Sequence, residues 1–259
     1  MAEVDRELSS FLAIKGPLVE ETYRAFRDWD LSVSAKENLK LIKETNSIGA
    51  SSNAWLRDVL FVLSRRYDLD AGDKTLIQFA QSGVSLDEWR AAQLWHIARH
   101  DKLLRIFIGD WLYDKREKDF AVLTAEAAKE FLFKALEVQF NGKCDWSPTT
   151  IARVASRLLT TATEFHLLRG KTKREFVAYH LPERSFIYLL CAMMERESST
   201  TRVIHSPDWR LFLMTVQAVE DELLRLHQYG KLRFERAGSL LELTLPYSDT
   251  AECVRSLAS

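Results

Sequence analysis

The sequence predicts a mainly α-helical protein, in which an N-terminal helical bundle precedes a C-terminal half that contains short β-hairpins. Nine glycines and five prolines among 259 residues are few for an all-β chain, and a charged fraction of 28% favours a helical chain. Apolar residues recur at helical spacing through the first 140 residues. Beyond residue 140, helical segments are followed by segments in which apolar and polar residues alternate, as in strands. We therefore expect two domains, residues 1–140 and 141–259.

Six helices are predicted in the first domain from capping residues and apolar stripes. Pro17 suits a first helical turn, Ser34 is a good N-cap, and the Asn46–Gly49 segment is a good helix stop. The predicted helices run from Pro17 to Trp29, from Ser34 to Asn46, from Ser51 or Ser52 to Arg66, from Ser85 to His96, from Lys102 to Leu112 and from Thr124 to about Gln139.

The second domain opens with a helix that a hairpin follows. Asn141-Gly142 is a strong turn signal, and Ser147-Pro148 places an N-cap before a proline at the first helical position. Two runs after the helix, Phe165 to Leu168 and Glu175 to Leu181, show the alternation of strands. With the predicted helix from Thr124 to about Gln139 placed before the turn, the order is helix, turn, helix, hairpin. This order is typical of a winged helix, so we expect this half to be winged-helix-like. The apolar side of the helix consists of Ile151, Val154, Ala155, Leu158, Leu159 and Ala162.

A basic run, Arg169 to Arg174, lies between the two predicted strands. From Trp146 to Pro182 six basic and two acidic residues give a local net charge of +4, in a chain whose formal net charge is −1. This excess suits a polyanion, because a polar helix face can enter a major groove while the wing follows the phosphate backbone. The alternative is a solvated hairpin tip, where lysines keep edge strands from pairing. The DNA-binding candidates of this region are Thr149, Thr150, Arg153, Arg157, Arg169, Lys171, Lys173 and Arg174.

A second helix and hairpin follow in the same order. Ser206-Pro207 repeats the cap, a long helix is expected from Asp208 to about His227, and two alternating runs meet at a turn near Gly238. This unit carries more acidic and fewer basic residues than the first. It therefore suits protein contacts or structural support of the first unit better than it suits DNA.

Basic residues in the bundle supply a second set of DNA-binding candidates. The alternative is an ordinary solvated face, because Glu37 and Glu44 can pair with the neighbouring lysines. These candidates are Arg57, Arg65 and Arg66 on the third predicted helix and Lys36 and Lys40, followed by Lys43, on the second.

No catalytic motif in the sequence is complete. Gly170-Lys171-Thr172 ends like a phosphate-binding loop, but Phe165 stands where that pattern needs a glycine. His96 and His100 lie one helical turn apart, yet Ile97 replaces the glutamate of the zincin pattern, so two partly exposed helix histidines are expected. No lysine has an acidic residue two positions before it, the usual offset in restriction-type nucleases. The sequence thus predicts no catalytic residues, no metal site and no cofactor.

Cysteine usage and hydropathy favour a cytoplasmic location. Three widely spaced cysteines indicate neither a disulfide framework nor a zinc site. The longest apolar run, Phe186 to Met194, is far shorter than the roughly 20 residues that span a bilayer. The first ten residues, MAEVDRELSS, lack the features of a signal peptide. We therefore expect no membrane partner.

Three segments of the chain resemble the BrxA family of bacteriophage exclusion (BREX) defence systems. They are LVEETYRAFRDWDLSVSAKENLKLIKETNSIGASSNAWLRDVLFVLSRRYD, WSPTTIARVASRLLTTATEFHLLRG and DWRLFLMTVQAVEDELLRLHQYGKLRFERAG. The resemblance covers most of the chain in order. It implies a helical protein that binds double-stranded DNA and acts with the methyltransferase and other components of the system in antiviral defence, that is, in phage resistance. It implies no catalytic residues.

Two other functions remain open at this stage. A scaffold within the defence complex would use the wing to meet an acidic protein partner. An RNA-binding protein would use the same basic surface to read the shape of an A-form duplex.

Overall fold

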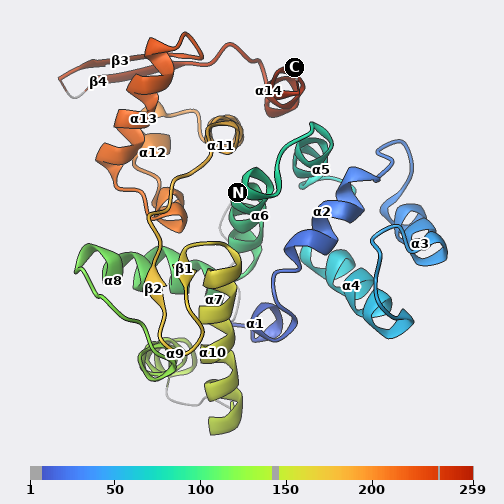
Figure 1. Cartoon of the computed structure of the whole chain (residues 1–259). Helices are drawn as coiled ribbons and strands as arrows, with labels where there is room; N and C mark the ends of the chain where they lie inside the picture. The colour runs from blue at the N-terminus through green and yellow to red at the C-terminus, as the bar shows by residue number, and fades with distance from the viewer. Residues whose placement is uncertain (1–7, 142–145, 239, 259) are drawn as a thin grey trace. The chain divides into compact units, whose positions relative to one another are not determined.

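The computed structural model describes residues 8–141, 146–238 and 240–258. The described chain is mostly helical, with two small antiparallel hairpins in the C-terminal half (Figure 1). The predicted fold class, mainly α with short β-hairpins, is therefore confirmed. Within the described ranges, no helix is both long enough and apolar enough to span a membrane.

The helices gather into two compact units whose segments interleave along the chain. Unit 1 contains described residues 8–18, 97–180 and 210–213, and unit 2 contains residues 19–96, 181–209 and the described residues after 213. The predicted domain boundary after residue 140 lies inside unit 1.

Unit 1 is built around a pair of long helices. Its elements are α1 (Phe11–Lys15), the end of α6 (Leu86–His100), α7 (Lys102–Arg105), the π-helix η1 (Ile106–Leu112), α8 (Tyr113–Glu117), α9 (Ala125–Phe140), α10 (Pro148–Glu164), β1 (Leu168–Arg169) and β2 (Glu175–Phe176). α10 packs against α9 and α1, and β1 lies against α10 (Figure 1). The segment from α7 through η1 to α8 is one continuous helical stretch, so the predicted stop at Leu112 is extended to Glu117.

Local capping chemistry sets the ends of the two long helices. The Thr124 side chain accepts a hydrogen bond from the backbone N–H of Ala127 at the start of α9, and Asn141 ends that helix in the left-handed conformation. Ser147 caps α10, with Pro148 at its first position as expected. The other half of the predicted turn, Gly142, lies outside the described residues.

The first hairpin is shorter than its alternating sequence predicted. Leu168 pairs with Phe176 and Arg169 with Glu175, while an isolated antiparallel bridge joins Leu123 to Arg174. His166 has a φ of 60°, so the chain turns there instead of forming a strand from Phe165. The order within unit 1 is therefore helix, single bridge, helix, helix, hairpin.

Unit 2 contains the remaining elements. They are α2 (Val19–Arg27), α3 (Ala35–Thr45), α4 (Asn53–Arg66), α5 (Lys74–Gln81), most of α6, α11 (Glu183–Arg196), α12 (Thr200–Ile204), the start of the 3₁₀-helix η2 (Pro207–Phe212), α13 (Val216–Gln228), β3 (Arg233–Ala237), β4 (Leu240–Thr244) and α14 (Thr250–Leu257). Ser34 and Ser52 cap α3 and α4, as the sequence predicts. Buried aromatic rings form the core, in which Phe26 meets Trp29, Tyr67 and Trp89 edge to face.

The long helix predicted from Asp208 to His227 is wrong. η2 ends at Phe212, and Leu213 then adopts a φ of 58°, which a helix cannot continue through. The Thr215 side chain accepts a hydrogen bond from the Ala218 backbone N–H and starts α13 afresh. The hairpin after it matches the prediction, since β3 and β4 pair antiparallel and Phe234 faces Leu243.

A buried polar chain in unit 2 corrects the expectation for His96. Its side chain is buried, with Nδ1 2.5 Å from Asp73 Oδ1 and Nε2 2.7 Å from the Tyr188 hydroxyl. With Asp73 ionised, Nδ1 donates to the carboxylate and Nε2 accepts from Tyr188. His96 is therefore a hydrogen-bonded core residue and not a partly exposed one.

Candidate nucleic-acid interface

α10 presents a sharply divided surface. Its predicted apolar side is entirely buried, because all six apolar residues face the core of unit 1. Arg153 and Arg157, four residues apart, are exposed on the other side. Neither guanidinium has an ion-pair partner among the residues that the structure describes. The helix thus offers two adjacent cations to an external anion.

The two threonines at the start of α10 differ in their roles. Thr149 is exposed. Thr150 is half-buried and belongs to the cap, since its backbone N–H donates to Ser147 Oγ at 3.2 Å and its hydroxyl lies 2.9 Å from the same oxygen. Thr149 is therefore the better placed of the two for an external contact.

The wing, residues 169–174, runs from the last residue of β1 to the residue before β2, and its cations differ in exposure. Lys171 and Lys173 are exposed at the tip. Arg169 is also exposed, at 72% of its side chain, but it forms a 3.0 Å ion pair with Glu175 on the opposite strand. Gly170 has a φ of +100°, and a Cβ there would lie 2.2 Å from the Lys173 carbonyl oxygen. Glycine is therefore required for this tight turn.

Arg174 departs from the role that the sequence suggested. Only 7% of the residue is exposed, and its Nη2 donates to Thr160 Oγ1 at 3.1 Å. Burial lowers the pKa of its guanidinium. Its backbone N–H and carbonyl pair with Leu123 at 3.0 and 2.7 Å. Arg174 thus anchors the wing to α10, and we exclude it from the surface offered to a ligand.

This anchor brings the wing beside the basic side of α10. Thr160 follows Arg157 by three residues, and residues so spaced are neighbours on a helix surface. The bond between Arg174 and Thr160 therefore fixes the root of the wing next to Arg157. Sequence reasoning missed both Thr160 and Leu123, because a threonine in a helix and a leucine in a loop carry no signal of a tertiary anchor.

The candidate cations of the bundle belong to unit 2. Lys36 and Lys40 are exposed on α3, where Lys40 lies 3.8 Å from Glu44, and Arg57 and Arg65 are exposed on α4. Arg66 is only 7% exposed, so its side chain is removed from that surface. That the exposed lysines of α3 and arginines of α4 contact DNA stays a prediction.

Comparison with known proteins assigns the chain to a family. In the part of the chain that the structure describes, two helical units and a basic helix followed by a hairpin make this a mainly α-helical protein. The family model of BrxA matches residues 9–191, which include α10 and the first hairpin. The chain belongs to the BrxA family and is thus a component of a BREX phage-defence system. A search of curated proteins finds no similar sequence.

Proposed function

We propose that this BREX component binds double-stranded DNA through α10 and the wing, as an accessory protein without catalytic chemistry of its own. The order helix, bridge, helix, helix, hairpin in unit 1 supports a winged-helix interpretation, in which α10 is the recognition helix. On this proposal Arg153, Arg157 and Thr149 face the major groove, and Lys171 and Lys173 contact phosphates.

The observation that carries the proposal is the hydrogen bond between Arg174 and Thr160. It joins the wing to the part of α10 that exposes Arg157. The pair Arg153 and Arg157 and the pair Lys171 and Lys173 are therefore close to each other in unit 1. Exposed cations close to one another suit the regular negative charge of a duplex backbone. On this proposal the protein acts on duplex DNA in the cytoplasm, together with BREX partners such as the methyltransferase.

The test compares duplex DNA and duplex RNA of the same length and sequence in gel-shift titrations at several salt concentrations. We expect DNA to bind more tightly, because α10 fits the major groove of B-form DNA, whereas the major groove of A-form RNA is too narrow for side-chain reading. Equal or tighter binding of RNA would replace DNA with RNA as the ligand. Absence of binding to either duplex, with capture of a BREX protein by the nucleic-acid-free chain, would favour the scaffold function.

A further inference from the structure

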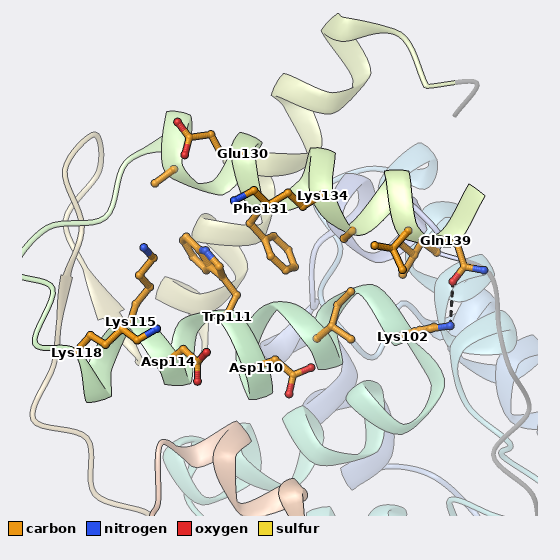
Figure 2. Close-up of a pocket in the computed structure, with 15 residues that line it drawn as sticks. Lys102, Asp110, Trp111, Asp114, Lys115, Lys118, Glu130, Phe131, Lys134 and Gln139 are labelled. Atoms are coloured by element: carbon orange, nitrogen blue, oxygen red, sulfur yellow. Dashed lines mark hydrogen bonds between the residues drawn. The ribbon is translucent and has the colours of Figure 1, made fainter. Parts of the chain in front are cut away.

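A pocket of about 640 Å³ lies in unit 1, apart from α10 and the wing. Its walls are α9 on one side and the stretch from α7 to α8 on the other, as Figure 2 shows. None of the residues that we propose for DNA contact lines it. Pockets that hold small molecules commonly enclose roughly 300–1,000 Å³, so this one is large enough for a nucleotide.

Two aromatic rings from opposite walls meet in the pocket. The ring centroids of Trp111, from η1, and Phe131, from α9, are 5.5 Å apart, and Trp111 stacks at 5.1 Å on the buried ring of Phe107. Trp111 and Phe131 are each only half-buried, so part of each ring stays open to the pocket. Together they form an apolar surface that the buried ring of Phe107 supports.

The backbone that carries Trp111 is unusual. Residues Ile106–Leu112 form a π-helix, a conformation that is rare and frequently found at functional sites. Both Asp110 and Trp111, which line the pocket, come from this segment. The local widening of the helix and the aromatic wall of the pocket therefore coincide.

Lysines surround the aromatic pair. The Lys115 ammonium lies 3.8 Å from the centroid of Phe120 and 6.0 Å from that of Trp111, so aromatic faces hold it beside the pocket. Lys134 extends from α9 toward the same aromatic pair (Figure 2). At the far end Lys102 donates to Gln139 at 2.9 Å. Lys118 and the carboxylates Asp110, Asp114 and Glu130 also line the pocket.

We propose that this pocket binds a free nucleotide, with the base against Trp111 and Phe131 and the phosphates on Lys115 and Lys134. A purely apolar ligand would leave the lysines unmatched, and a bare anion would leave the aromatic surface uncovered. A nucleotide satisfies both, because any base can stack on an aromatic ring and a lysine ammonium serves as a point charge for phosphate. The carboxylates accept hydrogen bonds from ribose hydroxyls or exocyclic amino groups.

Calorimetric titration of the full chain with ATP, adenosine and inorganic triphosphate tests the proposal. ATP is expected to bind at least tenfold more tightly than either fragment, because only ATP fills both parts of the pocket. No binding of ATP at millimolar concentration would overturn the proposal. Triphosphate that binds as tightly as ATP would overturn it too, since charge alone would then explain the binding.

Two variants locate the ligand within the chain. Trp111→Ala should weaken ATP binding about tenfold or more, in line with the loss of one stacked base. The pair Lys115→Ala, Lys134→Ala should weaken ATP binding and leave adenosine binding unchanged, and it keeps the test valid if Trp111→Ala fails to fold. Lys129→Ala, on α9 outside the pocket lining, is the matched control.

The wing supplies the control that separates this site from the DNA surface. Lys171→Ala, Lys173→Ala should bind ATP like the unaltered chain, because neither lysine lines the pocket. Loss of ATP binding in this wing variant would place the nucleotide elsewhere and overturn the proposal. The proposal is also overturned if the variant Lys115→Ala, Lys134→Ala loses no more affinity for ATP than Lys129→Ala does.

Discussion

On the proposed function, recognition of DNA by α10 depends on Arg153 and Arg157. Both are exposed opposite the buried apolar side, so replacing them with glutamate should leave the thermal midpoint nearly unchanged. Each reversal replaces attraction to the phosphate-lined groove by repulsion, and duplex affinity should fall steeply. Gel shifts and thermal unfolding on one preparation of Arg153→Glu, Arg157→Glu measure both effects.

A charge-matched variant controls for net charge. Lys231→Glu, Arg255→Glu reverses two exposed cations of unit 2 and should retain most of the duplex affinity. If the α10 variant keeps its DNA affinity but no longer captures a BREX partner, the scaffold function is the better explanation.

Tyr188 is a second residue at which a substitution should change the free energy of unfolding. Tyr188→Phe deletes the hydroxyl that bonds His96 Nε2 and leaves that buried nitrogen without this partner. The free energy of unfolding should fall by about 1–3 kcal/mol. Urea denaturation measures it, with Tyr229→Phe as the control because the Tyr229 residue is 69% exposed. Equal stability of the two variants would show that the buried network contributes nothing.

At the residue scale, the sequence predicted which side of α10 is buried but not which wing cations are available. Helical period alone places Ile151 and Leu158 on one side and Arg153 on the other. The burial of Arg174 depends on Thr160 and Leu123, which are 14 and 51 residues away in sequence. A count of charges in a short run cannot register such tertiary contacts.

Of the described glycines, Gly170 in the wing turn leaves the least room for an added Cβ. Gly170→Ala would force a Cβ to within 2.2 Å of a backbone oxygen at a φ of +100°, so the hairpin must shift. We expect a loss of about 1–3 kcal/mol in local stability and weaker duplex binding. Hydrogen exchange of the wing amides and gel shifts report the two effects.

Gly230→Ala is the control for that substitution. Gly230 also has a positive φ, of +67°, but an added Cβ meets nothing within 4 Å. Its effect should be smaller and should leave DNA binding intact. A wing that exchanges no faster in Gly170→Ala than in Gly230→Ala would argue against a rigid turn.

Elements with local end signals were predicted well, and elements defined by tertiary contacts were not. Ser34, Thr124 and Ser147 mark helix starts because capping depends on only three or four neighbouring residues. The break at Leu213 and the π-helix of η1 were not predicted, since an apolar pattern runs through both. The pocket was not predicted either, because the position of Trp111 fits an ordinary helical apolar stripe.

At the scale of the whole molecule, the two units interleave along the chain. A fragment of residues 1–140 contains α9 but lacks α10, the helix against which α9 packs. Leu132 and Leu136, both buried, would be exposed, so α9 should lose its order in the fragment. Hydrogen exchange should show rapid exchange in α9 and slower exchange in α4, whose neighbour α3 is retained.

If the α9 amides exchange as slowly in that fragment as in the full chain, the result would instead support a domain that ends at residue 140. If the fragment also binds duplex DNA at low salt, the exposed cations of α3 and α4 form a second contact surface.

The salt dependence of duplex binding tests the central claim most directly. In the folded variant Lys171→Ala, Lys173→Ala, the plot of log affinity against log salt should become shallower by about 0.9 for each lysine–phosphate contact that the substitutions remove, with sequence preference almost unchanged. Lys74→Ala, Lys231→Ala, which removes two exposed lysines of unit 2, should keep the original slope. A wing variant whose slope equals that of the unaltered chain would contradict DNA binding through the wing.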